Sequence, residues 1–195
     1  MKALRYIMAL LFIALLISCQ SGKPVRRLSD DGFMFAMIYD QSGSPVSGAT
    51  VYLNGRRTVV SDIQGRFVLE SMKRGSYKIL LVKSGYEILE EEFQYLPMQV
   101  LYLKMTNTAA LIELAENALD RRDLGEAEHY IERALAVEPM RPDIEFLSAI
   151  VYYLQGRLDR AAEVLGGMIA RGSADRSVFR LLENIRSIQE SGGDL

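Results

Sequence analysis

Residues 123–139 read DLGEAEHYIERALAVEP, and this stretch decides the fold of the C-terminal half of the chain. Asp123 to Ala127 open a helix, and Ala134 to Pro139 close it. Beyond Lys104, alanine and leucine become more frequent while glycine and β-branched residues become rarer, which favours helices. This part of the chain also carries ten arginines, no lysine and sixteen acidic residues, so it is an acidic helical segment.

The helical pattern repeats with a period of 34 residues. Small and aliphatic residues carry the repeat in four pairs: Ala115 and Ala149, Leu124 and Leu158, Ala127 and Ala161, and Ile131 and Leu165. The period resembles the tetratricopeptide repeat, a helical hairpin in which small residues let two helices approach closely. The resemblance implies two such hairpins within residues 106–190.

The resemblance is incomplete, and the array needs a terminal helix. Leu111 and Glu145 occupy the places of the usual tryptophan, and Ser173 stands near the place of the second closing proline. A last helix is expected over about 176–189, with Asp175 as its N-cap. Residues 191–195 are expected to form a disordered tail. One apolar stripe would make the last helix a solubilising cap, and its residues are Val178, Leu181, Leu182 and Ile185.

The first helix of each unit lines the concave face in tetratricopeptide repeats, so the resemblance implies a concave stripe here. By helical spacing it contains Ile112, Glu116, Leu119, Phe146, Ile150 and Tyr153. The stripe is mostly apolar, and our hypothesis is a groove for a hydrophobic segment of a partner. The alternative is that the stripe packs on its own neighbours or on the preceding domain. Because two hairpins and a cap are fewer than the three units usually needed, a partner or a second copy of the chain could cover residual apolar surface.

The segment from Gly32 to Lys104 predicts short strands separated by turns. Asn54-Gly55 is typical of a type I′ hairpin, which needs two positive φ angles. The number and even spacing of the strands predict a seven-stranded β-sandwich over residues 32–105. The chain is therefore expected to be an α+β multidomain protein. The expected strands are Phe33–Tyr39, Ala49–Leu53, Thr58–Ser61, Phe67–Leu69, Ser76–Val82, Ile88–Tyr95 and Met98–Leu103.

Residues 40–51, DQSGSPVSGATV, resemble the opening of carboxypeptidase regulatory-like domains. Residues 61–67, residues 75–77 and Gly85-Tyr86 continue the family pattern in order and spacing. The resemblance implies a transthyretin-like (prealbumin-like) sandwich that serves as an accessory module without catalytic residues. A peptidase is not expected, because its metal ligands would require more than the single histidine of this chain.

The N-terminus predicts an export signal over residues 1–18. Lys2 and Arg5 precede an uncharged apolar run over residues 7–17, shorter than the roughly 20 residues of a membrane-spanning helix. Residues 16–19, LISC, resemble the bacterial lipobox, which implies that Cys19 becomes an N-terminus that carries acyl chains such as palmitate. The alternative is a plain secretory signal with a chance cysteine. Residues 20–31 are polar and predict a flexible tether after the acylated cysteine, so residues 19–31 form one anchoring segment.

The composition excludes several classes of function. A net charge of −2 over 195 residues offers no basic surface for nucleic acid. One cysteine and one histidine exclude a disulfide framework and most zinc centres, so we expect no metal, no cofactor and no catalytic site. His129 is expected on an exposed helix face. Asp62 followed by Gly65 could suggest a calcium-binding loop. One acidic turn supplies too few oxygen ligands for calcium, so a plain turn is expected.

These patterns predict a non-catalytic, lipid-anchored protein of the bacterial cell envelope. In lipoproteins of some bacteria an aspartate after the cysteine favours retention in the inner membrane, so the resemblance, with Gln20 at that position, implies the outer membrane, on either its periplasmic or its surface face. The helical repeats would act as a scaffold or assembly factor by binding an envelope protein. The alternative is a surface lipoprotein that binds a glycan or another ligand through the sandwich loops. The absence of tryptophan counts against this alternative, since tryptophan is a common sugar-stacking platform.

Overall fold

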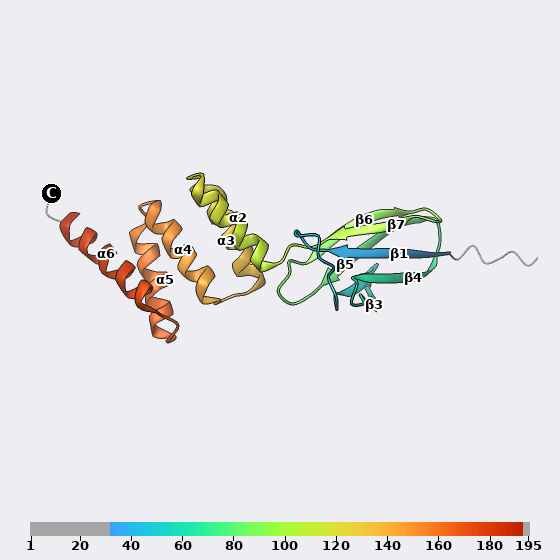
Figure 1. Ribbon diagram of the computed structural model, residues 1–195, viewed down its shortest axis with the longest axis horizontal. Helices are drawn as coiled ribbons and strands as arrows, with labels where there is room; N and C mark the ends of the chain where they lie inside the picture. The colour runs from blue at the N-terminus through green and yellow to red at the C-terminus, as the bar shows by residue number, and fades with distance from the viewer. Residues whose placement is uncertain (1–31, 193–195) are drawn as a thin grey trace, which may run out of the picture.

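The computed structural model describes residues 32–192, so the expected signal, Cys19 and the tether lie outside the described residues. Seven strands in two sheets are followed by five helices (Figure 1), which confirms the expected fold class. The strands are β1 (Gly32–Tyr39), β2 (Thr50–Leu53), β3 (Arg56–Val60), β4 (Arg66–Met72), β5 (Gly75–Val82), β6 (Leu89–Tyr95) and β7 (Val100–Lys104). The helices are α2 (Thr108–Asp120), α3 (Leu124–Val137), α4 (Pro142–Leu154), α5 (Leu158–Ala170) and α6 (Arg176–Gly192).

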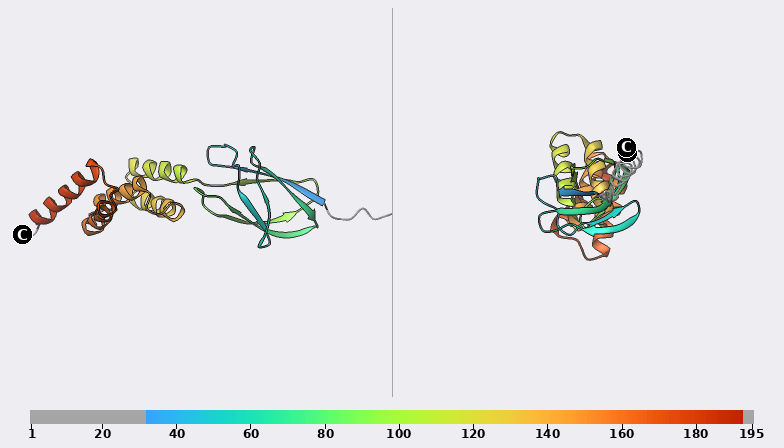
Figure 2. Two further views of the ribbon diagram at one scale, coloured as in Figure 1. Left: turned by 90° about the horizontal axis from the view of Figure 1, so that it is seen from below. Right: turned by 90° about the vertical axis from the view of Figure 1, so that its right-hand side faces the viewer.

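The sandwich and the helices lie end to end, which makes the described part of the chain elongated (Figure 1 and Figure 2). β1 begins at the end of the sandwich that lies away from the helices (Figure 1). The chain returns to the helix side of the sandwich along β7, which is parallel to β1 and leads into α2. The first described residue and the helices are therefore at opposite ends of the sandwich.

The core of the sandwich lies between its two sheets. One sheet has the order β4-β1-β7 and the other has the order β3-β2-β5-β6. Side chains alternate along β1, so that Met34, Ala36 and Ile38 are buried in the core while Phe33 and Phe35 are exposed on the outer face. A strand in the middle of a sheet thus presents aromatic side chains to the surface.

Turn geometry explains the glycine pattern of the sandwich at two positions. Asn54 and Gly55 have φ angles of 47° and 78°, which confirms the expected type I′ turn between β2 and β3. Gly65 has a φ of +72°, and a Cβ there would lie 2.4 Å from the carbonyl oxygen of Ile38. Only glycine therefore fits where the turn before β4 meets β1.

The loop between β1 and β2 is closed by polar side chains of the motif at residues 40–51. A carboxylate oxygen of Asp40 accepts hydrogen bonds from the backbone N–H of Ser42 at 2.9 Å and from its hydroxyl at 2.6 Å. The buried hydroxyl of Ser61 donates to the carbonyl of Val46 at 2.8 Å and accepts from the N–H of Ala49 at 2.9 Å. These bonds satisfy buried backbone groups in a segment without regular pairing.

Hydrogen bonds across the domain junction join the sandwich to the first helical hairpin. The N–H of Thr108 donates to the carbonyl of Gly85 at 3.0 Å, and the N–H of Glu87 donates to the carbonyl of Thr106 at 2.8 Å. The guanidinium of Arg133 on α3 makes two further bonds to the Glu87 carboxylate, at 2.9 and 2.7 Å. The loop between β5 and β6 therefore positions both helices of the hairpin.

Most strand ends and the end of the last helix differ by one to three residues from the sequence-based expectations, and two of these differences have a visible cause. α6 continues to Gly192, so Ser191 and Gly192 are helical rather than part of the expected disordered tail over residues 191–195. The hydroxyl of Ser191 donates to the carbonyl of Ser187 at 2.5 Å, which satisfies an acceptor in the last turns. β4 extends to Met72, beyond the expected end at Leu69, because its pairing with β1 continues past a bulge.

Candidate interaction surface of the helical repeats

Four of the five described helices begin at a polar N-cap side chain or at a proline. Asn107 and Asp123 each accept a hydrogen bond from the backbone N–H three residues on, at 2.8 and 3.0 Å. Pro142 occupies the first turn of α4, where its missing N–H costs no hydrogen bond. Asp175 accepts the N–H two residues on at 2.8 Å, which confirms it as the cap of α6.

Small residues allow the helices to pack closely, as the 34-residue period predicted. Ala115 on α2 and Ala127 on α3 are fully buried in the first helical cluster, and Ala149 and Ala161 are fully buried in the second. The first cluster joins α2, α3 and α4 through Leu111, Ala115, Ala118, Ala127, Ile131, Ala134, Ile144 and Val151. The second joins α4, α5 and α6 through Ala149, Ala161, Leu165, Met168, Val178, Leu182 and Ile185. α4 is therefore shared by both clusters.

α6 completes the array with an apolar inner face and a polar outer face. Val178, Leu182 and Ile185 are buried against α4 and α5, which confirms most of the expected stripe, and Leu181 is half-buried. Phe179 occupies the position equivalent to Leu111 and Glu145, 34 residues after Glu145. Its side chain is 54% exposed, because no further helix follows α6 in the described chain. The outer face is thus that of a terminal helix.

Four of the six residues of the concave stripe divide between the two clusters. Ile112 and Leu119 of α2 pack partly buried against the first cluster, while Phe146 and Tyr153 of α4 pack against the second. These four side chains therefore pack partly on the helical array itself. The two remaining members differ in exposure, since Ile150 is half-buried and Glu116 is exposed.

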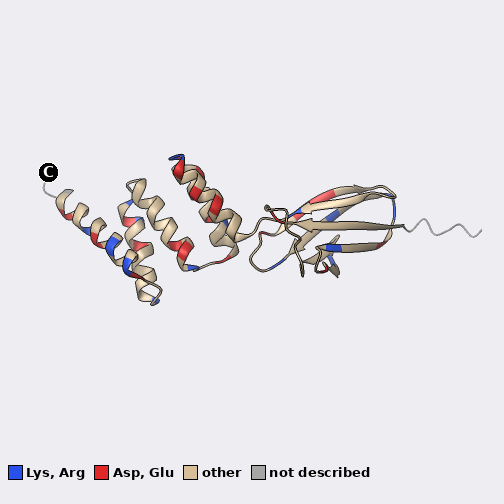
Figure 3. Ribbon diagram, viewed as in Figure 1, with Lys and Arg blue, Asp and Glu red and all other residues tan. Residues whose placement is uncertain are grey.

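The charge pattern differs between the first and the last helix. α2 carries Glu113, Glu116 and Asp120 and no basic residue within its bounds, whereas α6 carries both acidic and basic residues (Figure 3). No basic residue of α2 itself neutralises its carboxylates. A ligand that contacts α2 would therefore meet apolar side chains beside negative charge.

A polar network ties the first hairpin to the second. Glu128 on α3 accepts hydrogen bonds from the side-chain amide of Gln155 at 2.8 Å and from the guanidinium of Arg157 at 2.6 Å. These bonds, that of Gln155 foremost, lower the pKa of the Glu128 carboxyl below its ordinary value. The Arg157 guanidinium also lies 4.5 Å from the ring centroid of Tyr152. The network fixes the loop between α4 and α5 on the surface of α3.

The second hairpin carries the charged residue Glu145 in the place of the usual tryptophan, and an ion pair accommodates this charge. One oxygen of the Glu145 carboxylate bonds to Arg171, at the C-terminal end of α5, while the other is buried without a hydrogen-bond partner among the described residues. A Cβ on Gly167 would come within 3.2 Å of the Arg171 guanidinium, so this glycine makes room for the pair. The ion pair therefore links the start of α4 to the end of α5.

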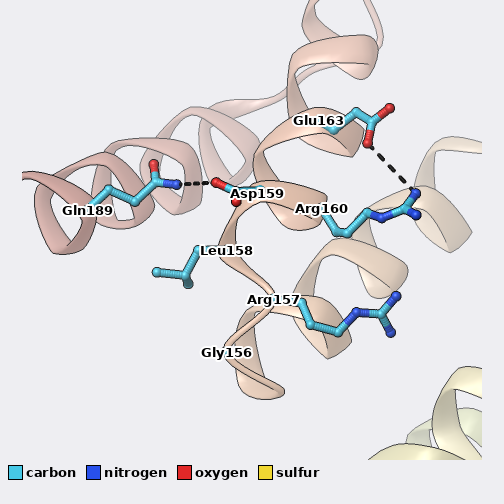
Figure 4. Close-up of a pocket in the computed structure, with 7 residues that line it drawn as sticks. All are labelled: Gly156, Arg157, Leu158, Asp159, Arg160, Glu163 and Gln189. Atoms are coloured by element: carbon cyan, nitrogen blue, oxygen red, sulfur yellow. Dashed lines mark hydrogen bonds and ion pairs between the residues drawn. The ribbon is translucent and has the colours of Figure 1, made fainter. Parts of the chain in front are cut away.

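A hollow of about 660 Å³ lies where α5 begins, beside the end of α6 (Figure 4). Gln189 of α6 donates to Asp159 at 2.8 Å, while Arg160 lies 3.9 Å from Glu163, on the side away from Gln189 (Figure 4). The charged groups around the hollow thus already have partners within the protein. No sequence signal indicated this site, because its walls come from segments 30 residues apart.

Several other expectations concern single side chains. His129 is exposed, as expected, with its ring 5.7 Å from that of Tyr130. Asp62 accepts hydrogen bonds from the backbone N–H groups of Gln64 and Arg66, at 2.9 and 2.8 Å, which is the geometry of a turn. Within residues 32–192, no three His, Cys, Asp or Glu side chains gather in a way that could hold a metal ion. No helix in the same range combines the length and the apolar character needed to cross a bilayer.

Comparison with known proteins finds a sequence match in the helical part of the chain. Residues 112–175 match the tetratricopeptide repeat family model. No curated protein sequence matches the chain.

Solved structures similar to part of the chain come from bacterial proteins. The Bacillus anthracis TIE protein is 20% identical with a TM-score of 0.32, and the match covers 40% of this chain and 16% of that one. A type II cohesin–X-dockerin complex from Acetivibrio cellulolyticus is 18% identical with a TM-score of 0.34, covering 38% and 56%. The major pilin subunit BcpA of Bacillus cereus is 16% identical with a TM-score of 0.33, covering 40% and 28%. The matches thus span less than two thirds of each of these chains.

Proposed function

We propose that the protein is a non-catalytic, lipid-anchored protein of the bacterial cell envelope whose helical repeats bind another protein. The tetratricopeptide match over residues 112–175 indicates a role in protein–protein interaction. The observation that carries the proposal is the end-to-end arrangement of the two domains (Figure 1). Cys19 precedes Gly32 by thirteen residues, and Gly32 lies at the end of the sandwich opposite the helices.

Acylation of Cys19 would hold the sandwich close to a membrane. Thirteen residues reach at most about 45 Å when fully extended, and about 20 Å as a flexible coil. Stable anchoring needs more than one acyl chain, and lipobox cysteines receive several. The sandwich would then stand between the bilayer and the helical repeats.

The sandwich acts as a rigid spacer in this proposal. The hydrogen bonds of Gly85 and Glu87 to the segment before α2, and those of Arg133 to Glu87, oppose bending at the junction. A rigid spacer presents the repeats at a defined distance from the anchor. Anchoring would raise the effective concentration of the repeats near a membrane-bound partner.

The concave stripe is the proposed site of partner binding. Its half-buried residues, such as Ile112 and Phe146, keep part of their surface accessible, and exposed Glu116 adds a negative charge one helical turn after Ile112. We therefore expect the partner to contribute an apolar segment with a cationic side chain opposite Glu116. An amphipathic helix or an extended segment can both present such a combination.

Site-specific photo-crosslinking in the producing cells tests the proposal. A benzoylphenylalanine at position 150 of α4, a half-buried member of the stripe, should crosslink to one defined envelope protein, because the stripe contacts it. The matched control carries the same group at exposed Glu132 of α3, outside the stripe, and should give no such product. Glu116→Lys should reduce the yield of the complex about tenfold, which corresponds to about 1.4 kcal/mol, while the circular dichroism spectrum stays unchanged. Equal crosslinking from both positions would contradict the proposed site.

A further inference from the structure

The end of the sandwich where β1 begins is defined by strand pairing. Gly32 pairs with Met72 at the end of β4, and Gly75 at the start of β5 pairs with Tyr95 at the end of β6. β7 begins beside β1, since Val100 pairs with Phe35. The loops over residues 73–74 and 96–99 therefore lie beside Gly32, and we call this region the tether end.

Large apolar side chains are exposed at the tether end. Met98 is 100% exposed at the tip of the loop between β6 and β7, and its φ of 68° is unusual for a residue with a side chain. Leu96 in the same loop is 54% exposed. Next to the loop, the aromatic rings of Phe33 and Phe35 lie edge to face at 5.3 Å and are 60% and 53% exposed. A contiguous apolar patch on a protein surface commonly marks a binding site.

The patch surrounds a shallow hollow, and Gly32, the first described residue, forms part of its wall. The hollow has a volume of about 420 Å³, and Gly32, Phe33, Met98 and Val100 are among its walls. Because Gly32 is covalently joined to the segment that leads back to Cys19, an anchor at Cys19 would hold these side chains near the bilayer. A neighbouring hollow between the same loops contains Arg74 in its wall. A basic group beside apolar side chains suits the boundary between lipid headgroups and acyl chains.

The other end of the sandwich has a different character. It is occupied by the junction with the helices, where Glu87 bonds to Arg133 and Gln41 donates to Thr106 at 3.1 Å. Ile63, in the turn before β4, is an exposed apolar residue at this end, with 77% of its surface accessible. It provides a matched reference for Met98, because the two residues lie at opposite ends of one rigid domain.

We propose that the tether-end patch, made of Phe33, Phe35, Leu96, Met98 and Val100, docks on the surface of the lipid bilayer that holds the acylated cysteine. This inference rests on the proposed anchoring at Cys19. Met98 and Leu96 enter the boundary between headgroups and acyl chains, while Arg74 contacts anionic headgroups. Docking fixes the long axis of the protein relative to the membrane, so that the repeats point away from it.

Vesicle-bound fluorescence tests the docking separately from acylation. The chain from residue 19 onward carries Cys19→Ser and an N-terminal hexahistidine tag, and vesicles of phosphatidylethanolamine and phosphatidylglycerol with a nickel-chelating lipid replace the acyl anchor. Since the chain has one natural cysteine, Met98→Cys or Ile63→Cys supplies a unique site for an environment-sensitive NBD label. The label at position 98 should shift to the blue and be quenched by spin-labelled acyl chains, while the label at position 63 should keep its emission in water.

Each other outcome overturns the docking proposal. Water-like emission at position 98 on vesicles, or equal quenching at both positions, shows that the patch stays in solution. If the emission at position 98 shifts to the blue without vesicles, and the shift grows with protein concentration, a second copy of the chain covers the patch. If the emission shifts to the blue without vesicles and the shift is independent of protein concentration, the tether of the same chain covers the patch. In the tagged chain labelled at position 98, Leu96→Ser with Phe33→Ser should reduce the quenching by spin-labelled acyl chains several-fold, whereas Ile63→Ser should leave it unchanged.

Discussion

The guanidinium of Arg133 on α3 holds the carboxylate of Glu87, in the loop between β5 and β6, in a bidentate pair. The bonds run from Nε to Oε1 at 2.9 Å and from Nη2 to Oε2 at 2.7 Å. The residues lie 46 positions apart and belong to different domains. Parallel bonds of this kind constrain orientation as well as distance, so the pair sets the angle between the sandwich and the first hairpin.

Glu87→Gln should loosen the junction between the domains. We expect a loss of about 1 kcal/mol in unfolding free energy, since the lost bonds are charge-assisted but partly solvated. The distribution of distances between a spin label on the sandwich and one on α6, measured by double electron–electron resonance, should become broader. Glu90→Gln is the control, because Glu90 pairs with Lys78 within the sandwich and both side chains are about half exposed. An unchanged distance distribution in Glu87→Gln would mean that the backbone bonds alone fix the junction.

The same pair predicts how stability depends on pH. The hydrogen bonds from Arg133, which outweigh the effect of burial, lower the pKa of Glu87 below its ordinary value of 4.5. The folded protein therefore binds this proton less readily than the unfolded chain, so the pair stabilises the fold above that value. Its contribution declines as the pH falls through the folded-state pKa. Urea unfolding from about pH 6 to about pH 3 should show the parent and Glu87→Gln converging, whereas a constant difference would contradict this linkage.

Gly65→Ala should destabilise the sandwich far more than Gly43→Ala. Both glycines have positive φ, at 72° and 83°, but a Cβ meets the Ile38 carbonyl only at position 65. We expect a loss of about 1 kcal/mol at position 43 from backbone strain alone, and about 3 kcal/mol or more at position 65 from the added clash. Hydrogen–deuterium exchange of β1 measures both changes. Similar losses in the two variants would show that the turn relaxes around the new methyl group.

Ile185→Ala should destabilise the helical array, because α6 seals the second cluster. Ile185 is fully buried, and its truncation should cost about 2–4 kcal/mol. Ile188 on the same helix is 44% exposed, so Ile188→Ala should cost less than about 1 kcal/mol. Unfolding followed by helical circular dichroism compares the two. Equal and small effects would mean that α6 contributes little to the stability of the array.

Cys19→Ser should abolish acylation and release the protein from membranes. Mass spectrometry of the mature N-terminus should find a diacylglyceryl thioether on Cys19 in the parent protein. Labelling with an alkyne analogue of palmitate should follow the same pattern and disappear in the variant. Ser21→Ala, two positions beyond the cysteine, serves as the control and should keep both the label and the membrane fraction. A parent protein that is exported without the label would refute the anchor.

Local patterns predicted the elements of this protein well. The turn at Asn54-Gly55 and the cap at Asp175 depend on residues adjacent in sequence, so the sequence contains all the information they need. The 34-residue period likewise predicted the buried alanines, because a repeated packing contact repeats its residue type. Ends of elements were less predictable: the pairing of β4 with β1 and the bonding of Ser191 extended β4 and α6.

Contacts between distant segments could not be predicted. Glu128 looked like any helix-surface carboxylate, yet Gln155 and Arg157 reach it from the next hairpin. The stripe residues Ile112 and Phe146 pack against different clusters, a split that depends on how α4 is shared between them. The exposed apolar patch at the tether end could not be predicted either, because Phe33 and Met98 lie 65 residues apart in the sequence and come together through strand pairing.

The sequence by itself determined which segments are strands, which are helices and where each turn falls, because hydrophobic period, glycine conformation and helix capping act within a few residues. It also determined the lipobox-like motif at Cys19. Only the tertiary structure decided that the two domains stand end to end, held by Arg133 and Glu87, and that an apolar patch surrounds the start of β1. These features depend on strand order and helix stacking, which bring together side chains that no local pattern connects.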